Sequence, residues 1–453
     1  MTTLTAQLID KILAVKYEAL PAAAIDMAKA CTLDGIAVML AGATEPLGLG
    51  RIVTQYVKDA GGNPQATVIA GGFKTSMLNA AYANGTMAHA LDFDNTWYPL
   101  NHPTSPTLPA ILAIAENHNL GGKKMIESLA AAFEVQGRMR MAATGLETGS
   151  GFHKPGTTGQ FGAVTAAARM LDLDRQQMLM AFGIAGSRAG SISINTGTMT
   201  KSSHSGHAAR MGIECAVLAK MGFTGSADVF GPKGFFDTFL FGKAEPHLLI
   251  DNFGAPFRMV DPGVGFKKHP SNYFTHRPID AALALREEHG IQPRQIAKVD
   301  VVFPRFEYVN RPQPETGLDG KFSVQYTTAI ALLDGEITVD SFNNERRFAP
   351  DVVALLPKIA LHLDDKIPND FDRMHVDMTV TLTDGRVVAK RVDKLSGWIG
   401  SPLTREQRMK KFHSCAKRVL DKSVADRIVV IVENLDQLCD ICELMALTRG
   451  PAR

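Results

Sequence analysis

Residues 89–109, HALDFDNTWYPLNHPTSPTLP, place many reactive side chains between two alanine-rich segments. They include His89, Asp92, Asp94, Thr96 and His102. A connection between two helices needs only turn-forming residues, whereas catalytic groups concentrate in loops that a rigid scaffold holds in place. This segment can supply a histidine for proton transfer, carboxylates that orient it, and hydroxyl groups for an anionic substrate.

Three further segments combine histidine with glycine, serine or threonine, and lysine. They are residues 151–159 with His153, residues 195–207 with Lys201, His204 and His207, and residues 265–276 with Lys267, His269, Asn272 and His276. Taken singly, each histidine has a commoner role as a structural hydrogen-bonding residue. Because the segments share a composition, we expect them to meet in one site. Lysines there would bind carboxylates, and the glycine-rich run 151–159 could offer backbone N–H groups to an anion.

Metal binding is the first alternative. His89, Asp92 and Asp94 could donate ligands, and so could His204 with His207. Neither set has the HExxH spacing, and the lysines beside the clusters disfavour a divalent cation. We therefore expect no metal.

Nucleotide and covalent chemistry find little support. Gly48-Leu-Gly50 and Gly263-Val-Gly265 lack the context of a dinucleotide fold, and the sequence has no P-loop and no GxSxG near the clusters. No cofactor is required. Acid–base chemistry on a small anionic substrate remains, with lysines neutralising the charge that develops as a carbanion or enolate forms.

Composition excludes other classes of partner. A net charge of +2 gives no electrostatic case for nucleic acid or an anionic membrane, and no apolar run approaches the length of a membrane span. The N-terminus does not look like a signal peptide, and the five cysteines do not form a disulfide framework. We expect a cytoplasmic protein.

The elements that must position these clusters change type along the chain. Residues 1–260 carry alanine, methionine, leucine and glycine at helical spacing, with one short β-like run at 66–71. Alternating strands follow at 296–303, 376–382 and 386–392, the last two forming a hairpin around Asp384-Gly385, and 323–333 and 351–360 look helical. Thr404 and Gln407 mark a capping box at the start of a returning helical segment. We expect a mainly α protein: an all-helical domain of residues 1–265 and 398–453, and an inserted α+β domain of residues 266–397.

Six ordered motifs resemble the MmgE/PrpD family, which includes 2-methylcitrate dehydratase, cis-aconitate decarboxylase and iminodisuccinate epimerase. They are HALDFDNTW with NHPTSP, GFHKPGTTGQFGA, GTMTKSSHSGHAAR, FKKHPSNYFTH, YVNRPQP and KFSVQYTTAIALLDGEIT. The resemblance covers nearly the whole chain. It implies the same two-domain fold, a homodimer, and an active site between the domains.

The resemblance also implies a set of site residues, carried over from the decarboxylase-type site. They are Asp92, Thr96, His102, His153, Lys201, Lys267 and Tyr308. We expect His102 to exchange the proton at the substrate carbon and Tyr308 to be a second acid. His153, Lys201 and Lys267 would bind carboxylates. Asp92 and Thr96 would orient His102 or bind a polar group of the substrate, while His89 and Asp94 would only shape the helix end.

One position departs from the decarboxylase pattern. Asn272 stands where the decarboxylase has a histidine, and His276 further along is retained; both are expected at the substrate. The leading hypothesis is a cofactor-free lyase of a small di- or tricarboxylate, resembling either the decarboxylase or the dehydratase. An epimerase of a dicarboxylate and an inactive polycarboxylate-binding protein are the alternatives.

Overall fold

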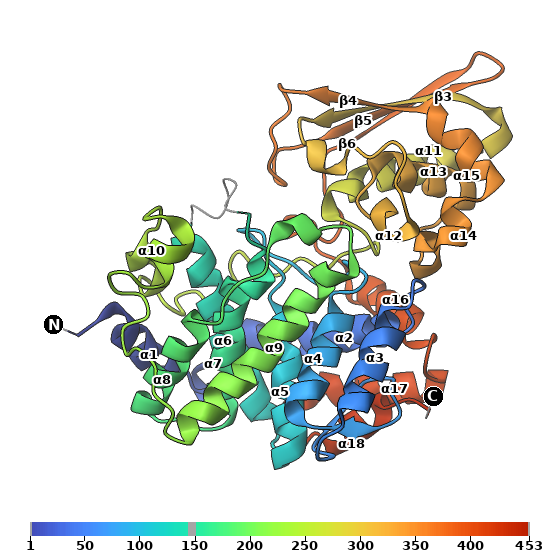
Figure 1. The fold of residues 1–453 in the computed structure, drawn as a ribbon. Helices are drawn as coiled ribbons and strands as arrows, with labels where there is room; N and C mark the ends of the chain where they lie inside the picture. Colours follow the sequence, from blue (N-terminus) through green and yellow to red (C-terminus); the bar gives the residue numbers. More distant parts are fainter. Residues whose placement is uncertain (1, 144–150, 452–453) are drawn as a thin grey trace.

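Helices make up most of the first 260 residues of the computed structural model, which describes residues 2–143 and 151–451 (Figure 1). The helices of this part are α1 (Leu4–Ala14), α2 (Ala22–Gly42), α3 (Leu49–Ala60), α4 (Met77–Ala88), α5 (Thr104–His118), α6 (Gly122–Ala142), α7 (Thr158–Met170), α8 (Arg175–Gly186), α9 (Met199–Lys220) and α10 (Phe235–Leu240). The β-like run at 66–71 yields only the short strand β1 (Ala66–Thr67), paired with β2 (Lys74–Thr75).

Small residues bring the helices of this part close together. Gly206 of α9 lies against α4, where an added Cβ would stand 2.2 Å from Thr86 Oγ1 and 2.3 Å from the Tyr82 carbonyl oxygen. Only glycine fits such an approach without a shift of backbone. The contact fixes α9, which carries Lys201 and His204, against α4, whose C-terminal cap is His89.

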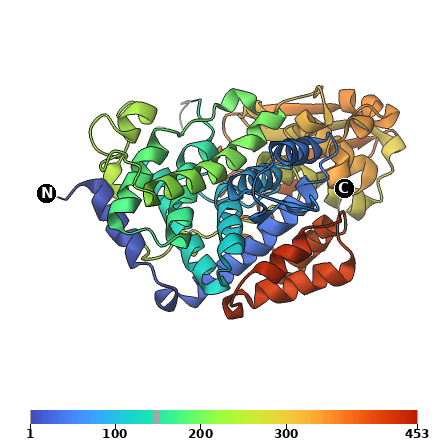
Figure 2. The ribbon, with the colours of Figure 1, turned by 60° about the horizontal axis from the view of Figure 1, so that its bottom comes forward.

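The C-terminal helices return to the helical part, as the capping box predicted. Thr404 and Gln407 form that box at the start of α16 (Arg405–Ala416), which is followed by α17 (Lys422–Glu433) and α18 (Cys442–Thr448). Helices α16 and α17 pack on α2, so the two ends of the chain share one core (Figure 2).

A four-stranded mixed sheet forms the smaller part. Its strands β3 (Ile296–Pro304), β4 (Ile359–Asp364), β5 (Val376–Leu382) and β6 (Val387–Val392) lie in the order β4-β3-β5-β6. The expected hairpin is β5–β6, and β5 alternates buried and half-buried residues. Helices α11 (His276–His289) and α13 (Val324–Asp334) pack beside the sheet (Figure 1).

The expected helix at 351–360 is wrong in its second half. Helix α15 (Pro350–Leu355) and a 3-10 turn (Leu356–Lys358) end before Ile359, where β4 begins parallel to β3. Strand β4 is an edge strand whose residues after Ile359 are mostly half-buried, so its sequence lacks the clear alternation of β5.

The buried apolar residues separate into two cores. One joins α1–α9 with α16–α18, and the other lies within residues 273–398. The fold class expected from the sequence, mainly α with an α+β part, is confirmed. We propose that residues 1–265 with 398–453 and residues 266–397 are the two domains.

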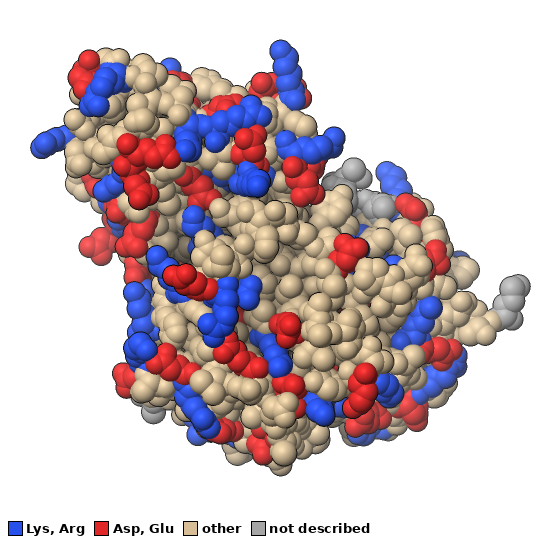
Figure 3. All heavy atoms as spheres, turned by 180° about the vertical axis from the view of Figure 1, so that it is seen from behind, with Lys and Arg blue, Asp and Glu red and all other residues tan. Residues whose placement is uncertain are grey.

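The surface mixes charges of both signs. On the face drawn in Figure 3, basic and acidic side chains are intermingled around a broad uncharged area. Within the described part of the chain, no helix is both long enough and apolar enough to cross a membrane.

Candidate active site

A cavity of about 140 Å³ brings together residues from both parts of the fold. It contains every predicted site residue except His276. Its lining consists of Asp92, Thr96, Leu100, Asn101, His102, His153, Lys154, Pro155, Lys201, Lys267, Asn272, Tyr273, Phe274, Tyr308 and Phe371. The sequence analysis missed Asn101 and the aromatic wall of Tyr273, Phe274 and Phe371. Aromatic residues at such positions look like ordinary core residues, so no sequence signal marked them.

Asp92 is the anionic centre of the site. Its carboxylate accepts from Lys201 Nζ at 2.5 Å and from Lys267 Nζ at 2.9 Å, and all three side chains are buried. Burial alone would raise the pKa of Asp92, but the two lysine cations outweigh it and hold that pKa well below its ordinary value. Burial favours neutral lysine. Asp92 nevertheless keeps the pKa of Lys201 above its ordinary value, whereas at Lys267 burial outweighs Asp92 and lowers the pKa of that lysine. Two lysine ammonium groups therefore share one carboxylate, and Lys201 is the more firmly protonated of the two.

Three buried lysines also hold the main chain of the turn that presents Asp92. Lys321 Nζ donates to the Ala90 carbonyl oxygen at 3.2 Å, Lys267 to that of Asp92 at 2.6 Å, and Lys411 to that of Phe93 at 2.8 Å. Asp92 has a φ of 49°, a left-handed conformation that few residues other than glycine and asparagine or aspartate adopt. The lysines come from three distant segments, so this turn is fixed by the assembled tertiary structure.

His102 lies nearer to Asp94 than to Asp92, which was expected to orient it. His102 Nδ1 lies 3.1 Å from Asp94 Oδ2, close but without hydrogen-bond alignment, while its Nε2 is 4.0 Å from Asp92. His89 Nδ1 is 2.9 Å from the same Asp94 carboxylate, and its ring meets the His102 ring edge-on. The two histidines outweigh the effect of burial and lower the pKa of Asp94. Asp94 therefore contacts both imidazole rings, in addition to its place after the end of α4.

We expect Asp94→Asn to lower kcat by about 10- to 100-fold with little change in KM, because the neutral amide no longer stabilises a protonated His102. Steady-state kinetics on the folded variant, checked by circular dichroism, measures the effect. A kcat within twofold of wild type would show that catalysis does not depend on the carboxylate of Asp94.

His153 faces the cavity in front of a second histidine. Its Nδ1 lies 3.0 Å from Nδ1 of His204, and its main chain is tied to Ser191. Burial, reinforced by the Lys201 cation, lowers the pKa of His153 well below its ordinary value and that of His204 to about 4. Both imidazoles are therefore neutral at pH 7.

Tyr308 enters the cavity from the α+β part, in the short 3-10 turn Glu307–Val309 after β3. Burial raises the pKa of its hydroxyl, and the cation of Lys201 partly opposes that rise. Arg311 stacks 5.4 Å from the centre of its ring. A protonated phenol in this place can donate to a substrate from the domain opposite His102.

Thr96 and Asn272 line the cavity but also have structural bonds. Thr96 Oγ1 donates to the Asn101 carbonyl oxygen at 2.7 Å, which closes the loop immediately before His102. Asn272 Oδ1 accepts from the Phe274 amide at 3.0 Å. Thr96 therefore orients His102 only through the loop.

His276 does not reach the cavity, contrary to the expectation that it binds substrate. It is fully buried at the start of α11, and its ring packs on those of His269 and Tyr273. His276 directly follows the 3-10 turn of residues 273–275 and packs against Tyr273, one residue of the aromatic wall.

Comparison with known proteins identifies the family to which this chain belongs. The family models described as the MmgE/PrpD N-terminal domain and the MmgE/PrpD C-terminal domain match residues 6–248 and 269–437. The chain belongs to the MmgE/PrpD family. The resemblance inferred from the six motifs is thereby confirmed.

Three relatives that match most of this MmgE/PrpD chain have names that denote lyases. The chain is 32% identical to cis-aconitate decarboxylase of Homo sapiens over 441 residues, 94% of this chain and 91% of the relative. It is 32% identical to the Mus musculus enzyme of the same name over 413 residues, which are 88% of this chain and 84% of the relative. It is 26% identical to 2-methylcitrate dehydratase of Salmonella typhimurium over 409 residues, which are 82% of this chain and 81% of the relative. Decarboxylases and dehydratases are both lyases, which confirms the expected enzyme class.

One group of described residues in this MmgE/PrpD chain has the spacing of metal ligands. A nitrogen from each of His89 and His102 and an oxygen of Asp94 lie within 4.8 Å of one another. It is a different set from the two that the sequence suggested. The expectation of a metal-free enzyme therefore stays a prediction.

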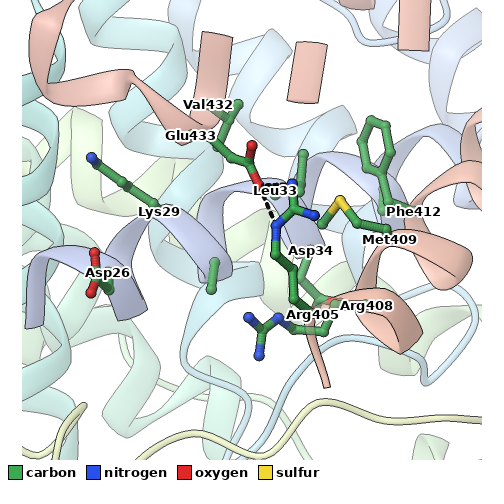
Figure 4. Close-up of a pocket in the computed structure, with 12 residues that line it drawn as sticks. Asp26, Lys29, Leu33, Asp34, Arg405, Arg408, Met409, Phe412, Val432 and Glu433 are labelled. Atoms are coloured by element: carbon green, nitrogen blue, oxygen red, sulfur yellow. Dashed lines mark hydrogen bonds and ion pairs between the residues drawn. The ribbon is translucent and has the colours of Figure 1, made fainter. Parts of the chain in front are cut away.

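A second cavity, of about 290 Å³, lies between α2, α16 and α17 (Figure 4). Several of its charges are paired: Arg405 with Glu433 at 2.6 Å, and Lys29 with the nearby Asp436. Asp34, a buried residue of the lining, pairs with Lys411 at 2.7 Å. This larger cavity lacks histidine and unites no sequence motifs, so the smaller one is the candidate active site.

Proposed function

We propose that this protein is a cofactor-free lyase of a small tricarboxylate, and that it decarboxylates cis-aconitate. The observation that carries the proposal is the pair Lys201 and Lys267 on Asp92, beside His102 in one cavity. The decarboxylases, at 32% identity over most of both chains, support that reaction over the dehydratase reaction, at 26%. The homodimeric state and the cytoplasmic location expected from the sequence remain predictions.

The two lysines supply the binding energy for an anion. Both are buried and share a single carboxylate, so a substrate carboxylate entering the cavity gains charge-assisted hydrogen bonds in a site of low dielectric. Tyr308 adds a neutral donor, and His153 lines the same cavity. The apolar wall of Phe274 and Phe371 excludes water from the carbon skeleton.

His102 is suited to the proton step. Loss of CO2 from the CH2–COO⁻ group of cis-aconitate leaves the electrons of the broken C–C bond in an allylic carbanion. Its charge extends to the carbon next to another carboxylate, where protonation gives methylenesuccinate. A protonated His102, stabilised by Asp94, donates that proton and recovers one from water, so the reaction consumes one proton per turnover. Lys201 and Lys267 stabilise the charge that develops.

The dehydratase alternative uses the same groups differently. His102 would remove a proton next to a carboxylate, while Tyr308 protonates the departing hydroxyl. An epimerase would return the proton to the opposite face without loss of any group. The three reactions therefore differ in products and in deuterium uptake.

A panel of cis-aconitate, 2-methylcitrate, citrate and iminodisuccinate in D2O, followed by ¹H NMR, distinguishes them. We expect CO2 loss from cis-aconitate and one deuterium in the product. Loss of water from 2-methylcitrate alone would transfer the proposal to the dehydratase, and deuterium uptake without loss of mass would indicate the epimerase. Turnover of none of these compounds would refute a lyase of this substrate class.

We expect exhaustive dialysis against EDTA to leave kcat unchanged, because two lysine cations perform the charge neutralisation that a divalent ion would otherwise provide. Elemental analysis of the dialysed protein, run beside the assay, verifies that it is metal-free. Inactivation that Zn²⁺, Mn²⁺ or Mg²⁺ reverses would instead assign His89, Asp94 and His102 to a metal.

A further inference from the structure

His204 lies behind His153 and contacts it through one ring nitrogen. The two Nδ1 atoms are 3.0 Å apart, and the ring centres are 5.1 Å apart. His204 is 7% exposed and sits on α9 one turn after Lys201, whereas His153 lines the cavity. In the sequence, His204 belongs to a segment expected to contribute to the site, and with His207 it was a possible metal ligand; no role beside His153 was expected.

A hydrogen bond between two neutral imidazoles fixes both tautomers. One Nδ1 must carry the proton and the other must accept it. If His204 donates, His153 carries its own proton on Nε2. If His153 donates, its Nε2 holds a lone pair. The choice decides whether His153 repels or binds an anion in the cavity.

The anionic substrate selects between these two states. Lys201, Lys267 and Tyr308 all present donors to the cavity, as a polycarboxylate requires. A lone pair at His153 Nε2 facing a carboxylate would be repulsive, whereas an N–H there completes the donor set.

We propose that His204 is a positioning residue for substrate binding: its Nδ1–H donates to His153 Nδ1 and so makes His153 Nε2 an N–H donor to a substrate carboxylate. This inference rests on the proposed function for the nature of the ligand.

Other contacts than the His204 ring hold the His153 backbone and helix α9 in place, so the proposed role of His204 can be tested apart from its effect on the fold. The His153 amide donates to the Ser191 carbonyl oxygen at 2.9 Å, and the His153 carbonyl accepts from Gly156 at 3.1 Å. Helix α9 is held by its glycine contact with α4. Loss of the His204 ring therefore leaves the His153 backbone in place and removes only the partner of its Nδ1.

Two substitutions of similar shape test the hydrogen bond. Asparagine at position 204 can place its amide N–H where Nδ1 lies, and leucine fills the same space without a donor. We expect His204→Leu to raise KM for cis-aconitate about tenfold with kcat within threefold, because a buried acceptor loses its partner. His204→Asn should stay within threefold of wild type in both constants. His207→Asn, one turn further along α9 and exposed, is the control.

Binding and tautomer are measured without turnover. Calorimetry with propane-1,2,3-tricarboxylate, which has no double bond to support decarboxylation, should show the same tenfold loss for His204→Leu. Long-range ¹H–¹⁵N spectra should show His153 protonated at Nε2 in the wild type; His153→Gln identifies its signals.

The outcomes separate the two proposals. The role of His204 would be overturned if wild type and His204→Leu had equal KM and equal affinity. It would also be overturned if the spectra showed His153 protonated at Nδ1. A wild type that neither binds nor converts any tricarboxylate would refute the proposed function, while the spectra would still test the hydrogen bond.

Discussion

Replacing His102 by alanine is expected to lower kcat by about 10²–10⁴-fold, the usual contribution of a general acid or base. His102 lines the cavity, its Nδ1 side is turned to Asp94, and its Nε2 lies 4.0 Å from Asp92 beside the two lysines. Binding depends on the lysines, so KM should change little. Steady-state kinetics with the methylenesuccinate product measured by NMR gives both constants.

His118→Ala is the matched control for this experiment. His118 ends the same helix, α5, that begins at Thr104 just after His102, and its side chain is exposed. We expect wild-type kinetics from it. If His102→Ala keeps its turnover while remaining folded, the proton donor is another group, with Tyr308 the first to examine.

Replacing Asp92 by asparagine is expected to lower the free energy of unfolding by about 3–5 kcal/mol, the usual effect of removing one partner from a buried ion pair. Lys201 and Lys267 would then remain buried with a neutral partner. Urea unfolding followed by circular dichroism measures the change. Asp10→Asn is the control, because Asp10 pairs with Arg175 on the surface and should contribute less than about 1 kcal/mol.

The same substitution gives a result that depends on pH. The folded-state pKa of Asp92 is lowered, so its ion pairs stabilise the fold fully above the unfolded pKa, near 4, and this stability is lost as the pH falls through the folded-state pKa. Wild type and Asp92→Asn should therefore differ most near pH 7 and converge in strong acid. Propane-1,2,3-tricarboxylate should stabilise the variant by placing a carboxylate between the lysines. Equal stability of the two proteins at pH 7 would contradict the electrostatic account.

The sequence predicted those elements that carry a strong local signal. The hairpin β5–β6 has clean alternation around Asp384-Gly385, and the capping box at Thr404 carries its own hydrogen-bonding pattern. Strand β4 was missed because an edge strand with half-buried residues has no comparable period. The residues proposed to transfer a proton or to bind the substrate, such as His102 and Lys201, were predicted through the family motifs, and both line the cavity.

The residues that position those groups were less accessible to sequence reasoning. Asp92 and Asp94 are two positions apart, and the motif does not indicate which carboxylate lies nearer to His102; in the structure it is Asp94. Lys321 and Lys411 hold that turn through the carbonyl oxygens of Ala90 and Phe93, from 231 and 318 residues away in the sequence. Isolated lysines in a sequence are usually exposed, so no pattern marked them as buried.

The most direct test of the account is the ¹H NMR spectrum of cis-aconitate incubated in D2O with the wild type and with His102→Ala. We predict that the wild type forms methylenesuccinate with one deuterium on its saturated carbon, and that the variant forms it at least a hundredfold more slowly. Unchanged cis-aconitate with the wild type, or equal rates for the two proteins, would contradict the account.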